Sequence, residues 1–206
     1  MTLVAITGTP GTGKTSVAAE LRSRGYEVVD LGEHIRSHGL LGDLDEERDT
    51  REVDLDLLND SLEEYRGKRG LVFMEGHLSH YIDCSAIVVL RCEPHILAER
   101  LRARGYAEPK VRENVQSEIL DVILCEAADT DIPVYEIDCT SASVGTCADG
   151  VLAAAEGRGE GLLPGRTDWS SEVDEWFSTD RERGRTSRWR QWPRGLYASI
   201  PTRYRG

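Results

Sequence analysis

The chain has 206 residues and a formal net charge of -12, and 39% of its residues are hydrophobic. This composition is that of a globular chain long enough to bury a core without disulfides or structural metals. No apolar run approaches the roughly 20 residues that cross a bilayer, so we expect no membrane span.

The five cysteines form no CxxC pair and have no histidines at zinc-finger spacing. The first residues lack the basic region and long apolar stretch of a secretory signal. We therefore expect reduced thiols and a cytoplasmic location.

The charge is unevenly distributed. Residues 178–206 contain eight arginines and two acidic residues, so the rest of the chain is strongly acidic. The field of this acidic part should repel nucleic acid, whereas residues 178–206 could bind it.

In chain order, apolar runs predict five strands and the segments between them predict helices. The second strand and the third are separated by a polar, acid-rich stretch, 31–54, in which we expect one short helix and a loop. Leucines at helical spacing follow over 55–62. Alternating strands and helices predict an open α/β fold with a five-stranded parallel sheet. The expected strands are 2–7, 27–30, 71–75, 86–90 and 134–138, and the other expected helices are 15–24, 94–103, 108–128 and 142–156.

The compact domain is expected to end near 157–165, where the composition shifts to glycine, proline and charge. Trp169, Val173 and Trp176 could dock one further helical turn onto it. Ligands of such sheets bind at the carboxyl ends of the strands.

The turn after the first strand reads GTPGTGKT, from Gly8 to Thr15, and fits G-x-x-x-x-G-K-[ST] without a mismatch. Glycines such as Gly11 and Gly13 let backbone N–H groups surround a phosphate, and the next helix points its positive end at it. Lys14 adds a charge near the β- and γ-phosphates, the Thr15 hydroxyl can bind Mg²⁺, and Ser16 can add a donor. A dinucleotide-binding turn has a different glycine spacing and no lysine.

The phosphate loop does not identify the molecule that accepts the phosphoryl group. No N-K-x-D motif is present, which argues against a GTPase. Glu75 ends the third strand beside the predicted phosphate loop, where a Walker B acid would hold Mg²⁺; the alternative is a solvated strand end. His77 could orient a water molecule, contact a phosphate or cap a turn. We expect His80 to be a surface histidine.

Residues 103–113 lie between two predicted helices, where small-molecule kinases have a lid. An arginine in such a lid neutralises charge on the transferred phosphoryl group. Arg104 and Arg112 are the candidates, with Arg100 behind them and Arg91 as a weaker one. The alternative is an ordinary turn with solvated arginines.

Several segments together resemble the archaeal putative adenylate kinases and their eukaryotic counterpart, adenylate kinase isoenzyme six. The motifs are GTPGTGKTS, VVDLGE, DEERDT, EGH, LRARGYAEPKVRENVQSEILDV, IDCT and PGRTDWS, spread over residues 1–177. This resemblance implies a P-loop NTPase fold and a broad-specificity nucleoside monophosphate kinase that converts ATP and AMP to two ADP, with ATPase activity. It also implies a role in 16S rRNA and small ribosomal subunit maturation, bound to a small-subunit ribosomal protein.

By motif position, the resemblance assigns ATP binding to Gly11, Gly13, Lys14, Thr15 and Ser16, and an ATP-contacting role to Arg104. Residues 30–53 match the monophosphate-binding region and 103–113 the lid. Glu75 stands where relatives often have Asp, so Mg²⁺ placement and the strength of the ATPase activity could differ. Glu75 and His77 are the acid and the histidine of the family's acid-x-His motif.

Residues 178–206 lie outside this resemblance, and we expect them to be largely disordered. Their arginines alternate with Trp189, Trp192, Tyr197 and Tyr204. Guanidinium groups with aromatic rings suit single-stranded RNA, so rRNA contact and a lineage-specific extension both stay open. Two rival functions also stay open: an ATPase that acts on a ribosomal protein, and a kinase for a non-nucleotide acceptor.

Overall fold

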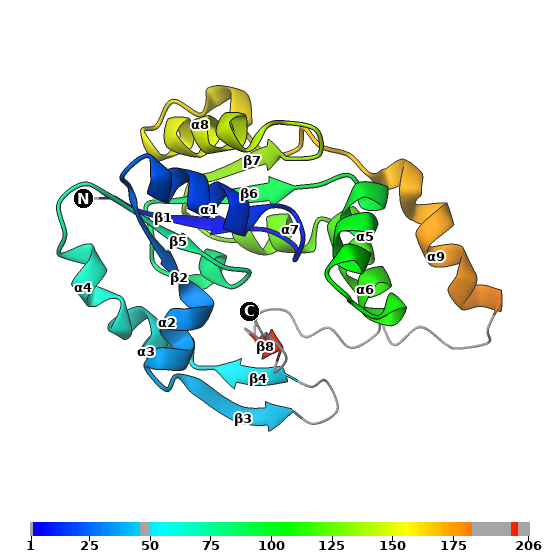
Figure 1. Cartoon of the computed structure of the whole chain (residues 1–206), viewed down its shortest axis with the longest axis horizontal. Coiled ribbons are helices and arrows are strands. Elements are labelled where there is room, and N and C mark those ends of the chain that lie inside the picture. Colours follow the sequence, from blue (N-terminus) through cyan, green and yellow to red (C-terminus); the bar gives the residue numbers. More distant parts are fainter. Residues whose placement is uncertain (1, 46–49, 183–198, 202–206) are drawn as a thin grey trace.

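The computed structural model describes residues 2–45, 50–182 and 199–201. Within them, five parallel strands form the main sheet in the order β2-β5-β1-β6-β7 (Figure 1). The predicted fold class, an α/β sheet of five parallel strands flanked by helices, is confirmed. The strands are β1 (Thr2–Thr7), β2 (Glu27–Asp30), β5 (Leu71–Glu75), β6 (Ala86–Arg91) and β7 (Val134–Asp138).

The central strands carry apolar side chains toward both faces, because both faces of the sheet are covered. All six residues of β6 are buried, and so are Leu3 to Ile6 of β1. The register pairs Ile6 with Glu75 of β5 and Thr7 with Val89 of β6. The carboxyl ends of β1, β5 and β6 therefore lie side by side at one edge of the sheet.

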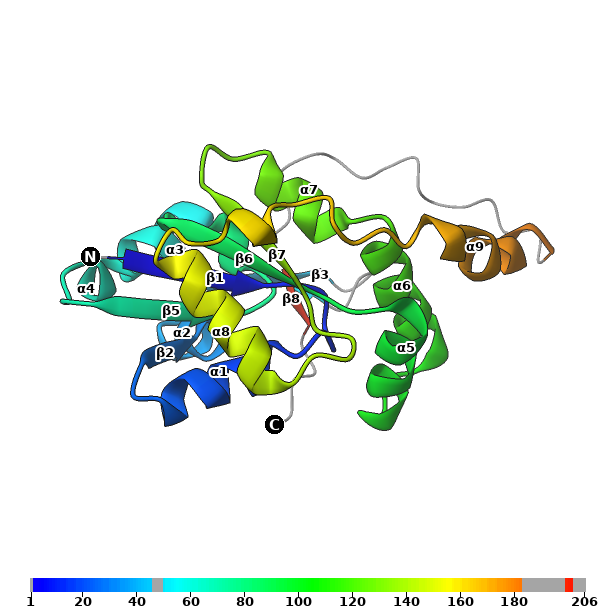
Figure 2. The same ribbon diagram turned by 90° about the horizontal axis from the view of Figure 1, so that it is seen from above.

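Helices cover both faces. Figure 2 shows α1 (Lys14–Ser23) and α8 (Val144–Ala155) on one side of the sheet and α7 (Val122–Ala128) on the other. The side with α7 also carries α2, α3 and a 3-10 turn, which bury leucines and isoleucines against β1 and β5. Their bounds are α2 (Leu31–Ser37), α3 (Leu55–Ser61) and η1 (Ser79–Tyr81), and the short α4 (Glu63–Arg66) follows α3.

A separate cluster of helices stands beyond the carboxyl end of the sheet (Figure 1). It consists of α5 (Pro94–Ala103), α6 (Glu108–Ile119) and α9 (Val173–Glu182). Trp176 of α9 is buried against them, and Trp169 and Val173 pack alongside. The predicted docking of these three residues is confirmed, although the helix continues past one turn. The connection from α8 contains η2 (Glu160–Leu162) and η3 (Ser170–Glu172).

The single helix predicted over 108–128 was wrong, because the structure divides it into α6 and α7. Asp121, between them, has a φ of 53°, the one positive φ at a non-glycine residue in the described ranges. A left-handed residue ends the hydrogen-bond pattern of the first helix and turns the chain. The Asp121 carboxylate pairs with the buried guanidinium of Arg91, which holds this turn.

The expectation of a loop after the short helix in 31–54 was wrong as well. The short helix is present as α2, but β3 (Leu41–Asp45) and β4 (Thr50–Val53) pair antiparallel. β8 (Ser199–Pro201) adds to β4, so a second sheet has the order β3-β4-β8. Figure 1 shows this sheet apart from the main one.

Most of the segment expected to be disordered, 178–206, lies outside the described residues, as do Trp189, Trp192, Tyr197 and Tyr204. Its described parts complete α9 and form β8. Across the part of the chain that the structure describes, we find no helix of the length and apolarity that a membrane crossing requires.

Candidate functional site

The loop between β1 and α1 has a backbone that only glycine adopts easily. Gly8 has a φ of +139° and Gly11 a φ of +98°. A Cβ on Gly8 would lie 2.4 Å from the Leu90 carbonyl oxygen, and one on Gly11 would lie 2.8 Å from Leu97 Cδ1. The loop is therefore pressed against the end of β6 and against α5. This packing fixes the curvature of the loop, and a glycine-rich backbone of this kind can turn its N–H groups toward a phosphate.

Lys14, the first residue of α1, is folded onto this loop. Its Nζ donates to the carbonyl oxygens of Gly8 at 2.7 Å and Thr9 at 3.1 Å, and the side chain is buried. Burial lowers the pKa of Lys14 to about 8, against the opposing effect of the Glu75 and Glu118 carboxylates. The ammonium is thus poorly hydrated. An anion could replace the two carbonyl oxygens as the acceptor of its hydrogen bonds.

Glu75 brings a carboxylate to the same place from the end of β5. Its side chain is buried, and Oε1 accepts a hydrogen bond of 3.3 Å from the Thr15 hydroxyl. Burial raises the pKa of Glu75, and the positive charge of Lys14 works against this. A carboxylate and a hydroxyl oxygen in contact are the ligands that Mg²⁺ prefers, so these two residues fit that ion. Ser16, next to Thr15, is exposed at the start of α1.

Of the four candidate arginines, Arg104 has the geometry expected of a lid residue. It is exposed at the carboxyl end of α5, and its guanidinium makes no hydrogen bond to any described residue. After burial, the largest influence, the positive charge of Arg104 also contributes to lowering the pKa of Lys14. Arg104 therefore stays the candidate for a lid residue.

The other three arginines hold the fold together. Arg100 donates to the carbonyl oxygens of Cys139 and Thr140, each at 3.1 Å. Arg112 donates to the Trp176 carbonyl oxygen and so ties α6 to α9. Arg91 is 1% exposed and surrounded by carboxylates. These contacts count against the roles in phosphoryl transfer considered for them from sequence.

Two histidines follow β5, and the structure corrects the expectation for one of them, His80. His77 is half-buried, and its carbonyl oxygen accepts from the Thr7 hydroxyl at 3.3 Å. The prediction of a surface position for His80 was wrong, because this side chain is 2% exposed. Its Nδ1 lies 3.0 Å from Thr7 Oγ1 and its Nε2 lies 3.1 Å from a Glu126 carboxylate oxygen. These contacts with β1 and α7 explain its burial.

Sequence reasoning missed Glu118, on α6. Its Oε2 accepts a 2.5 Å hydrogen bond from the Thr9 hydroxyl in the phosphate loop. The two residues are 109 positions apart. The only signal was a glutamate on a helix whose neighbours are apolar, which is too common a pattern to single out.

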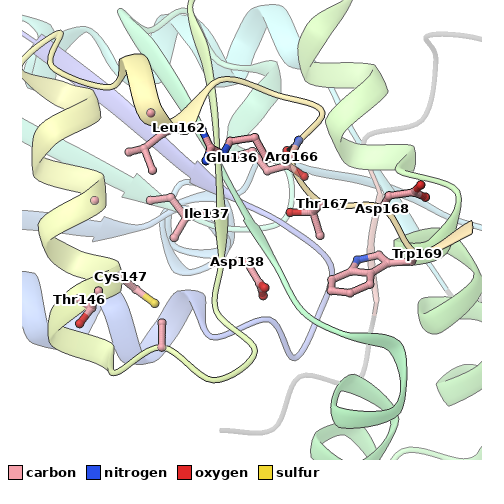
Figure 3. A pocket seen from close by; sticks show the side chains of 13 residues that line it. Glu136, Ile137, Asp138, Thr146, Cys147, Leu162, Arg166, Thr167, Asp168 and Trp169 are labelled. Atoms are coloured by element: carbon pink, nitrogen blue, oxygen red, sulfur yellow. Dashed lines mark hydrogen bonds between the residues drawn. The ribbon is translucent and has the colours of Figure 1, made fainter.

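A further cavity lies away from this loop (Figure 3). It has a volume of about 670 Å³, and β7, α8 and residues 161–169 line it. No residue of the loop from Gly8 to Thr15 lines it. It is therefore separate from the site around Lys14.

Glu93, His95 and Glu172 bring potential ligand atoms within 4.8 Å of one another. Glu93 accepts from two N–H groups at the start of α5, and His95 Nε2 lies 3.0 Å from a Glu172 oxygen. These groups satisfy one another, and we assign no ion to them.

A strand, a glycine loop with its lysine, a helix and an adjacent buried carboxylate define a P-loop protein. A protein-family model described as an AAA domain matches residues 4–121. A "Putative adenylate kinase" of Methanocaldococcus jannaschii is 38% identical over 178 residues, covering 86% of this chain and 98% of the relative. One of Archaeoglobus fulgidus with the same name is 42% identical over 176 residues, covering 84% and 94%. The chain belongs to this family of archaeal proteins, which are kinase-type phosphotransferases by name.

The solved structure of the YorR protein from Bacillus subtilis, in complex with phosphorylated GDP, has the same fold. It superposes with a TM-score of 0.50 at 15% identity, covering 75% of this chain and 96% of that one. At this identity the likeness concerns the fold alone.

Proposed function

We propose that this protein transfers the γ-phosphoryl group of ATP to a nucleoside monophosphate, with AMP as the first acceptor to test. The observation that carries this proposal is the meeting of Lys14, the Thr15–Glu75 pair and Arg104 around one phosphate loop. Phosphoryl transfer needs little covalent chemistry from the protein and depends on charge placed around the moving group. The name that the archaeal relatives share supports the adenylate as substrate.

The ATP-binding residues of this proposal are Gly11, Gly13, Lys14, Thr15 and Ser16. Lys14 would leave the carbonyl oxygens of Gly8 and Thr9 for the β- and γ-phosphates. Thr15 and Glu75 would hold Mg²⁺, which supplies charge neutralisation on the phosphate oxygens when bound. Because both oxygens face each other already, little rearrangement is needed.

Arg104 and the segment 103–113 form the lid of this proposal. The segment joins α5 to α6, and Arg102 and Glu108 brace it with an ion pair of 2.6 Å. Closure would bring Arg104 onto the phosphates and exclude water. His77, beside Glu75, is the residue we assign to orienting a phosphate or the water of the accompanying ATPase reaction.

Residues 30–53 form the monophosphate-binding region of the proposal. Asp30 is the register partner of Glu75 across β2 and β5, so the region starts beside the residue that contacts Thr15. α2, β3 and β4 follow along the chain. In this proposal the region would hold the acceptor on the Glu75 side of the phosphate loop.

The test is turnover with and without AMP. A nucleoside monophosphate kinase converts ATP and AMP to two ADP, faster than it hydrolyses ATP alone. If AMP leaves the rate of ADP formation unchanged, the chain is an ATPase or phosphorylates another acceptor. A panel of monophosphates then identifies the preferred one.

We also propose, on the resemblance and on the arginines of 178–206, a contact with a small-subunit ribosomal protein and 16S rRNA. Eight arginines are enough to give salt-dependent phosphate binding. The measurement is sedimentation with isolated small subunits at low and high salt, for the full chain and for a chain ending at Glu182. Equal sedimentation of both chains would remove the arginine-rich segment from the proposal.

A further inference from the structure

A carboxylate from a distant helix contacts the phosphate loop. Glu118, on α6, is 3% exposed, and its Oε2 accepts the 2.5 Å hydrogen bond from Thr9 Oγ1. Thr9 is itself 2% exposed. A hydrogen bond to an ionised carboxylate in a dry site is among the stronger ones in proteins. The first half of the loop is therefore fastened to α6, the helix whose first residues belong to the lid segment 103–113.

The orientation of Glu118 is set by its other oxygen. Oε1 accepts from Arg91 Nε at 2.8 Å and from the Cys92 N–H at 3.1 Å. The Arg91 guanidinium also donates to Glu136 Oε1 at 2.7 Å and to the Glu118 carbonyl oxygen at 3.0 Å. With every partner fixed, the carboxylate has one position relative to β6.

Thr9 in turn holds other residues of the loop in place. Its carbonyl oxygen accepts from Lys14 Nζ at 3.1 Å, from Thr12 Oγ1 at 3.0 Å and from the Thr12 N–H at 3.2 Å. The residue that Glu118 holds by its hydroxyl is thus one of the two that hold the lysine by their carbonyls. The negative charge of Glu118 also helps to keep Lys14 protonated.

Stability of the fold alone does not account for the hydrogen bond between Glu118 and Thr9. Buried ion pairs gain little over apolar side chains of the same size, because both charges must be desolvated. Here three carboxylates, those of Glu118, Asp121 and Glu136, surround the guanidinium of Arg91. One oxygen of this cluster is directed at a loop hydroxyl, which the apolar core does not require.

We propose that Glu118, oriented by Arg91, is a positioning residue for phosphoryl transfer that fixes Thr9 and couples the lid helix α6 to the phosphate loop. The proposal rests on the proposed function, since it concerns the same loop. A loop displaced by about 1 Å can cost as much as a hundredfold in rate. The contact therefore anchors the carboxyl-terminal end of α6, whose first residues belong to the lid segment 103–113, to the phosphate loop.

The test compares Thr9→Val with Thr9→Ser. Valine keeps the shape and removes the hydroxyl, and the fold should persist because Glu118 keeps the donors of Arg91 and Cys92. We expect kcat to fall about tenfold in Thr9→Val and to recover in Thr9→Ser. Ser85→Ala is the control, since Ser85 Oγ donates to the Leu3 carbonyl oxygen at 2.7 Å at the opposite end of the sheet. This control should keep the wild-type kcat.

Two measurements separate positioning from a structural role. The first is rescue: because Thr9→Ser restores the hydroxyl that Glu118 holds, it should restore both the kcat and the ATP affinity that Thr9→Val loses. The double variant Thr9→Val with Glu118→Gln should be no slower than the slower single variant, since both act through one contact. A Thr9→Val kcat within twofold of wild type, a Thr9→Ser as slow as Thr9→Val, or a double variant slower than both single variants overturns the proposal.

ATP binding by calorimetry, in the same variants, keeps this test apart from the proposed function. If the wild-type chain makes no ADP from AMP, the proposed function fails. The positioning of the loop then stands or falls on whether Thr9→Val, and not Thr9→Ser, weakens ATP binding.

Discussion

The Thr15 hydroxyl lies 3.3 Å from Oε1 of Glu75, although 60 residues separate them. The contact exists because β1 and β5 are neighbours in register, with Ile6 opposite Glu75. The phosphate loop separates β1 from α1, and Thr15 is the second residue of α1. The first turn of this helix therefore lies where β5 ends. The sheet order therefore assembles the pair of oxygens before any ligand is bound.

Lys14→Met tests the central charge of the site. We expect kcat to fall about a hundredfold or more, because one positive group facing the developing charge is lost. The thermal midpoint at pH 7 should stay level or rise, because burial of the ammonium opposes folding. Steady-state turnover and calorimetry measure the two effects. Turnover near the wild-type rate would rule out the role of Lys14.

Glu75→Gln tests the proposed Mg²⁺ site. The amide keeps the size and the hydrogen bond to Thr15 but removes the charge. We expect the Mg²⁺ concentration for half-maximal rate to rise about tenfold or more. Titration of Mg²⁺ at saturating ATP measures this, and Glu75→Asp shows whether the shorter side chain tightens the requirement. An unchanged titration in Glu75→Gln would place the ion elsewhere.

Arg104→Ala tests the lid, with Arg102→Ala as the matched control. Both arginines are exposed at the end of α5, but Arg102 is paired with Glu108 at 2.6 Å. We expect a tenfold to roughly hundredfold fall in kcat for Arg104→Ala, a modest rise in KM for ATP, and little change for Arg102→Ala. If the two variants lose activity equally, the effect belongs to the lid's stability and not to Arg104.

The pH dependence follows from Lys14. Its pKa is about 8 in the folded, nucleotide-free chain and 10.5 in its ordinary state, so the ammonium is lost as pH rises through 8. ATP affinity should therefore weaken between pH 7 and 9. Between pH 8 and 10.5 the unfolded chain binds more protons at this residue, so the contribution of Lys14 to the unfolding free energy rises with pH. Calorimetry of wild type and Lys14→Met across this range isolates both effects.

Truncation tests the second sheet. A chain ending at residue 198 lacks β8, and a chain ending at Pro201 keeps it. β8 pairs with β4 inside the proposed monophosphate region, so its loss removes a few backbone hydrogen bonds worth about 1 kcal/mol in all. We expect the KM for AMP to rise about fivefold in the shorter chain, with the KM for ATP unchanged. Identical KM values in the two chains would separate β8 from acceptor binding.

The main sheet could be predicted from sequence because each of its inner strands is a continuous apolar run. β6, with every residue buried, is the clearest example. The phosphate loop could be predicted because its chemistry is local: glycines, Lys14 and Thr15 are consecutive and need one backbone shape. Both signals are contained within about ten residues of chain.

The contacts that escaped prediction are long-range. The Asp121 turn depends on Arg91, thirty residues earlier, and no glycine marks its positive φ. The β3–β4 pairing is the local exception, and it escaped prediction because the acid-rich sequence lacks a regular apolar alternation. His80 looked like a surface residue because its partners, Thr7 and Glu126, lie 73 and 46 positions away.

The segment 159–166, after α8, packs against β7, the edge strand of the main sheet. β7 has no strand on its outer side among the described residues, and such borders invite pairing between molecules. Here the N–H groups of Gly165 and Arg166 bind Glu136 Oε2, at 2.9 and 3.0 Å, and Gly159 lies so close to the Tyr135 ring that a Cβ there would be 2.3 Å from it. A bulkier side chain at Gly159 would push the segment 159–166 away from β7. The consequence would be self-association into oligomers or aggregates, with the catalytic machinery itself untouched.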